Sequence, residues 1–298
     1  PSTLALKQGV NIIGVSPHET IIRGLGLATL IQLTGPAVIT KGIISNLTLT
    51  GADTGIDSSS YGVIVRNVIL RQMDIGIYGD DTSDISIINN TFISHTTAAI
   101  WVAGQTVIRN NIIIRNETGI WWLGIEADLS KLSITYNDVS GNTSDYVDCA
   151  AGVGNISENV IFTDEANSDY REKVGSASVD MGNPADGYLL EPEPNGERIN
   201  MGAFGNTPYA TTSQAAGSSV KYNGMNRGCF IATAVYGNYS HPNVMALRNF
   251  RDRYLVTNGL GRRFVNLYYK VSPPIAEYLK TAPIKSGLVR IALTPIVY

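Results

Sequence analysis

The sequence predicts a mainly β protein, a right-handed parallel β-helix followed by a small α-helical C-terminal domain. Three observations predict it: a repeat of about 22 residues, a low charge with abundant glycine, and a C-terminal stretch with apolar residues at helical spacing. The chain has 298 residues, 30 of them glycine, and only 16% are charged. This length and composition allow a sizeable core and exclude a disordered chain or a coiled coil.

The repeat is marked by asparagine, and an isoleucine lies three residues before each marker. The asparagines are Asn46, Asn67, Asn90, Asn111, Asn137 and Asn159, and the isoleucines are Ile43, Ile64, Ile87, Ile108, Ile134 and Ile156. A unit of this length is too short for a strand–helix–strand crossover, which needs roughly 30 residues, but it fits three short strands joined by bends. Stacked coils would place the isoleucines in the core and asparagine, which tolerates a left-handed backbone, at a bend.

Residues 4–209 resemble secreted bacterial and archaeal proteins with pectate-lyase-like parallel β-helix repeats. The segments GNISENVIF, DYREKVGSASVDMGNP and EPEPNGERINMGAFGNTPYA look like that family's terminal coil and cap, although Ser178 and Val179 stand where Ala-Ile is more common. The resemblance implies a β-helix with a terminal cap over residues 1–210. It also implies an extracellular or cell-surface location, with the signal peptide already removed.

The C-terminal region differs in kind from the repeat. Residues 211–225 have the small-residue composition of a linker, and residues 226–298 form a basic segment with helical spacing. The box CFIATAVYG at 229–237 resembles the CFIATAAYG box (CFI-box) of a short C-terminal domain found behind many bacterial and archaeal surface proteins. That resemblance implies export and surface assembly or attachment. We expect its apolar residues to form an interface: Phe230, Ile231, Phe264 and Tyr268.

Charge is divided unevenly along the chain. Residues 1–219 hold 11 Lys and Arg against 23 Asp and Glu, whereas residues 220–298 hold 11 against 2. The acidic body would repel the phosphates of a nucleic acid, and no uncharged apolar stretch is long enough to span a bilayer. A basic end and an acidic body favour the protein itself as partner, in a homo-oligomer or head-to-tail polymer such as a filament. Extracellular polysaccharide is the alternative partner.

Carboxylates provide the only candidates for catalysis. Asp53 and Asp74 lie at equivalent places in adjacent repeats, and Asp80 and Asp81 crowd the next bend. Such pairs suit glycoside hydrolysis or a calcium site. The Asn-Thr-Asp, Asp-Asp and Gly-His-Gly constellation of polygalacturonases and the Arg-rich motif of the lyases are absent, and acidic bends are common on solvated β-helices. We therefore expect no catalytic site and no cofactor, with a polysaccharide-degrading enzyme as the alternative.

Aromatic side chains should form a stripe on the outside of the coils. Tyr78, Trp101 and Trp121 each follow an inward-pointing isoleucine, so strand alternation directs them outward. Aligned aromatics indicate a contact surface, and we favour a protein interface over a sugar platform. Cys149 and Cys229 are a disulfide candidate in an oxidising compartment, with two free buried thiols as the alternative. The three histidines show no metal-ligand spacing, so we expect no metal site.

Overall fold

The computed structural model describes residues 2–7, 9–34, 41–59, 62–124, 126–213 and 268. The chain divides into two units, Pro1–Ser218 and Ser219–Tyr298. Of the predicted C-terminal domain, only Tyr268 is described, and it is helical and half-buried. Phe230, Ile231, Phe264, Cys229 and the predicted linker beyond residue 213 lie outside the described residues.

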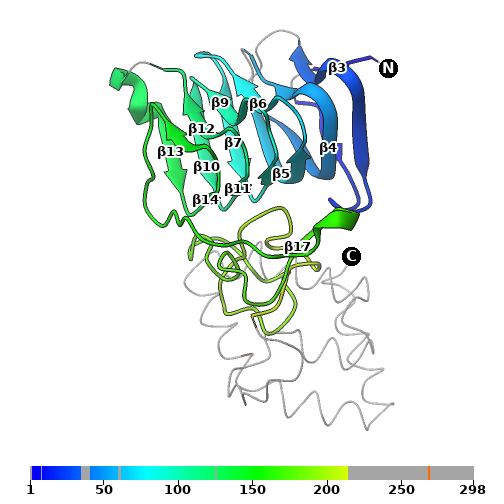
Figure 1. Cartoon of the computed structure of the whole chain (residues 1–298), viewed down its shortest axis with the longest axis vertical. Helices are drawn as coiled ribbons and strands as arrows, with labels where there is room; N and C mark the ends of the chain where they lie inside the picture. The colour runs from blue at the N-terminus through cyan, green and yellow to red at the C-terminus, as the bar shows by residue number, and fades with distance from the viewer. Residues whose placement is uncertain are drawn as a thin grey trace. The chain divides into compact units, whose positions relative to one another are not determined.

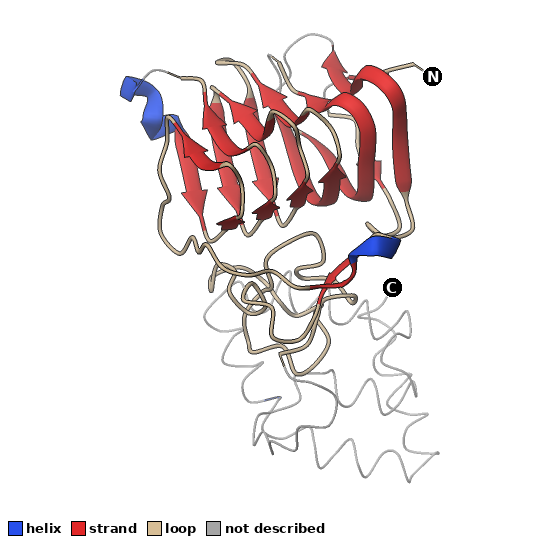
Figure 2. Cartoon of the chain, viewed as in Figure 1, coloured by secondary structure: helices blue, strands red, loops and turns tan. Residues whose placement is uncertain are grey.

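The first unit confirms the predicted fold class. It is mainly β and forms a right-handed parallel β-helix of about 5 turns (Figures 1 and 2). The strands are β1 (Leu4–Lys7), β2 (Ile12–Ile13), β3 (Ile21–Thr34), β4 (Gly42–Asp57), β5 (Gly62–Arg71), β6 (Ile75–Gly79), β7 (Asp84–Ile88), β8 (Thr91–Ile93), β9 (Ala98–Val102), β10 (Gln105–Arg109), β11 (Ile112–Ile114), β12 (Thr118–Trp122), β13 (Leu132–Thr135), β14 (Asp138–Ser140), β15 (Ser144–Val147), β16 (Phe162–Asp164) and β17 (Asp169–Glu172). Two 3-10 helices, η1 (Glu126–Lys131) and η2 (Glu165–Asn167), complete the described elements.

The coils of residues 4–149, which we call the shaft, stack their strands on three faces. Face A holds β2, the first part of β4, the first part of β5, β7, β10 and β13. Face B holds the start of β3, the middle of β4, the end of β5, β8, β11 and β14. Face C holds β1, the end of β3, the end of β4, β6, β9, β12 and β15. Every pair within these faces is parallel, so equivalent residues of successive coils are neighbours.

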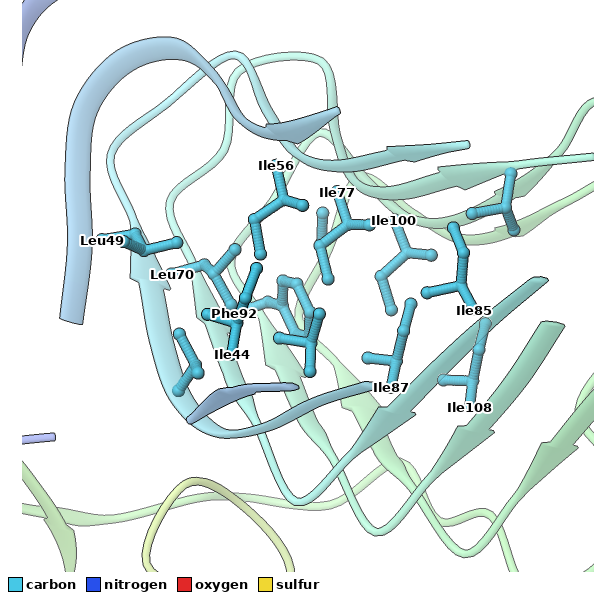
Figure 3. Packing of buried hydrophobic residues seen from close by; sticks show 14 of the residues in the cluster. Ile44, Leu49, Ile56, Leu70, Ile77, Ile85, Ile87, Phe92, Ile100 and Ile108 are labelled. Carbon is cyan, nitrogen blue, oxygen red and sulfur yellow. The ribbon is translucent and has the colours of Figure 1, made fainter. Parts of the chain in front are cut away.

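Each face sends at least one column of apolar side chains into the core (Figure 3). On face C the column is formed almost wholly by isoleucine, and Tyr146 ends it: Ile31, Ile56, Ile77, Ile100 and Ile120. On face A it is Ile44, Val65, Ile87, Ile108 and Ile134, and on face B it is Leu49, Leu70, Phe92, Ile113 and Val139. Because these columns stack identical or similar shapes, the core fills with one side-chain pattern repeated along the shaft.

The predicted register is wrong by one residue in the first two repeats. Ile43 and Ile64 are only half-buried, and Ile64 pairs with Ser86 rather than with Ile87. The asparagine series likewise joins two different columns, since Asn67 lies beside Asn89 and one residue away from the level of Asn90. Asn89 and Asn90 both fit the sequence pattern, but Asn89 forms a bend and Asn90 belongs to a ladder of hydrogen bonds.

One asparagine column forms the bend between faces A and B. Asn46, Asn67, Asn89 and Asn110 have φ between 53° and 58°, the left-handed region that asparagine tolerates better than most residues. Tyr136 takes the same bend in the next coil, with φ of 55°. The longer step to Tyr136 includes η1, so the extra residues leave the coil as a separate turn.

The second asparagine column points inward and forms a ladder. Each Nδ2 donates to the Oδ1 of the next member, at 3.0, 2.8 and 2.8 Å along Asn90, Asn111, Asn137 and Asn155. Each Oδ1 also accepts from the backbone N–H of the preceding member. The predicted member Asn159 is exposed, and Asn155 ends the ladder instead. Buried amides are thus fully paired, as a buried polar column requires.

Residues 156–213, which we call the cap, cover the outer side of face B. Here the chain leaves the repeat and forms a two-stranded antiparallel sheet from β16 and β17, followed by turns. A second apolar cluster joins the cap to outward residues of face B: Ile69, Ile93, Ile112, Ile114, Phe162, Tyr170, Met201, Ala203 and Phe204. The isoleucines of face B are therefore buried on both sides of the sheet.

Candidate functional site

Two of the four candidate catalytic carboxylates, those of Asp74 and Asp80, accept local hydrogen bonds. Asp53 and Asp74 sit on adjacent coils, where the Asp74 N–H donates to the Asp53 carbonyl at 2.9 Å, and both are exposed. The Asp74 carboxylate accepts a hydrogen bond from Thr96 Oγ1. Asp80 Oδ1 accepts from the N–H and the hydroxyl of Thr82, at 3.1 and 2.8 Å, which closes the bend before the exposed Asp81. Among the described residues, no three His, Cys, Asp or Glu side chains converge as they would around a metal ion.

The aromatic stripe lies in register on the outside of face C. Tyr78, Trp101 and Trp121 are direct neighbours on β6, β9 and β12, and all three are half-buried. The indoles of Trp101 and Trp121 stack with centroids 4.9 Å apart and planes 13° from parallel. Tyr78 meets Trp101 edge-on, with centroids 5.8 Å apart. The two stacked indoles therefore each cover one face of the other.

The cap docks on the outward asparagine column. Asn67 Nδ2 donates to the carbonyls of Ala203 and Gly205 at 3.1 and 2.9 Å. In the next coil, Asn89 Nδ2 donates to the carbonyls of Asn200 and Gly202 at 2.9 and 3.4 Å. Each amide thus reaches two carbonyls that lie two residues apart in the cap.

The third contact of this column carries charge. Asn110 Nδ2 donates to Asp186 Oδ2 at 2.8 Å, and Asn110 Oδ1 accepts from the Asn183 N–H at 2.7 Å. Arg109 Nε also lies 2.8 Å from Asp186 Oδ2, in an ion pair whose N–H does not point at the oxygen. The bend asparagines are therefore a docking strip for peptide backbone, a role that the repeat alone did not predict.

A groove of about 220 Å³ opens where this strip passes the end of the cap. The bend residues Asn46 and Asn67 and the neighbouring Arg66 form one wall. The rest of the lining comes from the first coil and the cap: Val15, Ser16, Pro17, Leu190, Asn206, Thr207, Pro208 and Tyr209. Arg66 is exposed, and no described residue pairs with its guanidinium or with the Asn46 amide.

The N-terminal end of the shaft exposes apolar side chains. Val15 and Leu25 are each 75% exposed and Ile13 is 61% exposed, and Leu4, Val10 and Ile21 add to the same end. Leu25 also has φ of 49°, a conformation that is an outlier for a bulky side chain. Within the described residues, strands β1 and β2 each pair on one side only, with β3 and β4 respectively, so this end of the described sheet has an open edge.

The cap buries carboxyl groups that the sequence did not single out. Glu191 Oε1 accepts from the backbone N–H groups of Asn200 and Asn206 at 2.9 and 2.7 Å, while burial raises the pKa of Glu191 to about 8. Burial likewise raises the pKa of Glu172 to about 7, and Ser178 Oγ donates to its carboxyl. The hydrogen bonds of these groups join turns of the cap to one another, so their contacts indicate a structural role.

His95 is the corresponding buried base of the shaft. Its Nδ1 and Nε2 lie 3.3 and 3.1 Å from the carbonyl oxygens of Met73 and Leu70, and burial lowers the pKa of His95 to about 4. The neutral ring can donate to only one of these carbonyls. Cys149 is half-buried with Sγ 3.6 Å from the Ile120 carbonyl, and burial raises the pKa of its thiol to about 11.

Comparison with known proteins concerns the shaft alone. Searches of the curated proteins and of the solved structures returned no match. The narrower resemblances, to pectate-lyase-like proteins and to the CFI-box domain, stay predictions. Within the described residues, no helix combines the length and apolar character needed to cross a bilayer. Residues 28–164 match the family model of the right handed beta helix region, so sequence and structure agree on the architecture of this part of the chain.

Proposed function

We propose that the protein is an extracellular structural protein of the cell surface that associates with itself as the subunit of a filament. A right-handed β-helix fits a secreted surface protein or a polysaccharide-related one. The observation that carries the choice is the N-terminal end of the shaft, which combines an open parallel sheet edge with exposed Val15, Leu25 and Ile13. An exposed apolar patch on an unpaired edge is the surface that a second chain covers.

Leu25 strengthens this proposal because its backbone conformation and its exposure are both unfavourable in the isolated subunit. A leucine in the left-handed region is strained by about 1 kcal/mol or more, and 75% exposure gives it no compensating burial. Contact with a second copy would supply that burial. An exposed, strained apolar residue is therefore better explained by association than by folding.

The other features fit association less directly. The acidic body and basic C-terminal segment favour a head-to-tail contact that repeats without closing. Residues 226–298 are the connector that the sequence predicts, and the described residues supply the receiving surface. Polysaccharide binding is the weaker alternative, because a sugar ring stacks on an exposed aromatic face and the Trp101 and Trp121 indoles already cover one face of each other.

Leu25→Asn tests the proposal in the full chain. Asparagine accepts the left-handed backbone, so the melting temperature should stay equal or rise, whereas association should weaken at least about tenfold as the patch is lost. Val174→Asn is the matched control, since Val174 is an exposed valine of the cap. Sedimentation velocity over a concentration series provides the readout. A wild-type chain that stays monomeric throughout would overturn the proposal.

A further inference from the structure

The groove beside Arg66 extends the strip that holds the cap. Along this strip Asn67 and Asn89 each donate to carbonyls of residues 200–205, a cap segment made mostly of bends and turns. Asn46 is the next member toward the N-terminus, with the same left-handed bend and φ of 57°. Its amide lines the groove, and no described residue accepts a hydrogen bond from it. The strip therefore has one position that is built like the others but holds no peptide within the described residues.

The lining indicates which peptide would fit. Arg66 supplies an unpaired guanidinium on an otherwise acidic body, and arginine recognises carboxylates through paired hydrogen bonds. Val15, Pro17, Leu190 and Pro208 make much of the remaining wall apolar. A sugar would leave this apolar wall without a matching surface. An extended peptide with an apolar side chain between or beside acidic ones would match every part.

The opposite end of the shaft carries such a segment. Residues 148–158 follow the last strand of face C and contain no strand longer than an isolated bridge. Asp148 and Glu158 are both exposed, and Val153 between them is 72% exposed. No described side chain pairs with either carboxylate. The two ends of the shaft are therefore complementary in charge and in apolar character.

We infer that the groove is a binding site for residues 148–158 of a second copy of the chain, in which Asn46 donates to a backbone carbonyl and Arg66 pairs with Asp148 or Glu158. This inference rests on the proposed self-association and assigns its contact. Val15 belongs both to the groove and to the exposed apolar end, so the two surfaces are continuous. Apolar burial would supply most of the affinity, and the charge pair would fix orientation and register.

Charge reversal tests the inference. Arg66→Glu should weaken association by about 10- to 100-fold, because a charge-assisted hydrogen bond is lost and like charges meet. Lys173→Glu is the control, with the same charge change at an exposed site of the cap outside the groove. A chain that combines Arg66→Glu with Asp148→Lys and Glu158→Lys should regain most of the wild-type association. Sedimentation velocity gives the association constants, and thermal melts verify folding.

The outcomes separate the two proposals. If Arg66→Glu associates like the wild type while Leu25→Asn does not, self-association stands and the groove assignment fails. If the charge-exchanged chain stays as weak as Arg66→Glu, the assignment to residues 148–158 is wrong. A wild-type chain that never associates overturns both. Saturable binding of D-glucuronate that Arg66→Gln removes, with association unchanged, would make the groove a sugar site and also overturn the inference.

Discussion

The shaft and the cap bury polar groups in opposite ways. In the shaft, one uncharged contact recurs from coil to coil. The side-chain amides along this ladder pair with one another: Asn90, Asn111, Asn137 and Asn155. The cap uses single contacts, and its buried Glu172 and Glu191 carry raised pKa values. In a repeat, each buried amide can form hydrogen bonds with the equivalent amide of the next coil. In a segment without repeats, each buried polar group needs its own hydrogen-bond partner. Loss of an interior rung should therefore destabilise the shaft, and a change of pH should act on the cap through its buried carboxyl groups.

The largest expected effect is the loss of an interior rung. Asn111→Ala removes the acceptor of the Asn90 N–H and one of the two acceptors of the Asn90 amide. It also removes one of the two donors to Asn137 Oδ1 and a donor to the Ile87 carbonyl. The free energy of unfolding should fall by about 4 kcal/mol, since each unsatisfied buried group costs about 1–3 kcal/mol. Urea denaturation measures the loss.

Asn155→Ala is the control for this rung, because Asn155 ends the ladder and is only half-buried. It should cost about 1–2 kcal/mol. Equal losses of unfolding free energy for Asn111→Ala and Asn155→Ala would mean that interior members of the ladder contribute no more than its end. That result would contradict the contrast between shaft and cap.

Glu191 in the cap and His95 in the shaft should make the stability respond to pH with opposite signs. In the cap, burial raises the pKa of Glu191 from 4.5 to about 8, so the folded state favours the protonated carboxyl. Its stabilisation is complete below pH 4.5 and is lost as the pH rises toward 8. In the shaft, burial lowers the pKa of His95 from 6.5 to about 4, so stabilisation is complete above pH 6.5 and is lost as the pH falls toward 4.

Each of these two pH-dependent contributions to the free energy of unfolding should be on the order of 3 kcal/mol. Glu191→Gln keeps the oxygen that accepts from Asn200 and Asn206 and removes the titration. It should remove the Glu191 part of the stability loss at rising pH, keep the part that Glu172 contributes, and leave the loss at falling pH unchanged. Hydrogen exchange at several pH values resolves the two regions, and a cap that becomes more protected as pH rises would contradict the assignment.

A smaller effect is expected from the aromatic stripe. Trp101→Ala removes the stack with Trp121 and the edge contact with Tyr78, and these half-buried rings should contribute about 2 kcal/mol. The shaft should stay folded, because the inward column at Ile100 is untouched. Loss of association in this variant, with stability unchanged, would move the interface from the N-terminal end to face C. Sedimentation velocity and urea denaturation together distinguish these results.

The repeat made the architecture predictable. The register was predicted less well, because asparagine suits both the bend and the buried ladder. Asn89-Asn90 and Asn110-Asn111 each offer two residues that suit either a left-handed bend or a buried ladder. Only the coil-to-coil pairing decides between them, which is why the predicted column moves from one role to the other after Asn67. The stripe of Tyr78, Trp101 and Trp121 followed correctly from strand alternation.

The contacts of the cap could not be predicted in the same way. Glu191 binds N–H groups 9 and 15 residues further along the chain, and no repeat or motif marks such a pairing. The groove is equally hidden, since Val15, Arg66 and Tyr209 come together only when the cap docks on the shaft. Sequence periodicity reveals contacts that recur from coil to coil. The Glu191 contacts and the groove lining each occur once, so periodicity does not reveal them.

Hydrogen exchange of β1 and β2 tests the central claim, that the open N-terminal edge is where copies of the chain meet. Exchange would be measured on the full chain at a dilute and at a concentrated condition. The amides of residues 4–13 should exchange at least about tenfold more slowly in the concentrated sample, because an added partner covers the edge. Those of β16 and β17 should not change. Identical exchange of residues 4–13 at both concentrations, in a sample that has associated, would contradict the claim.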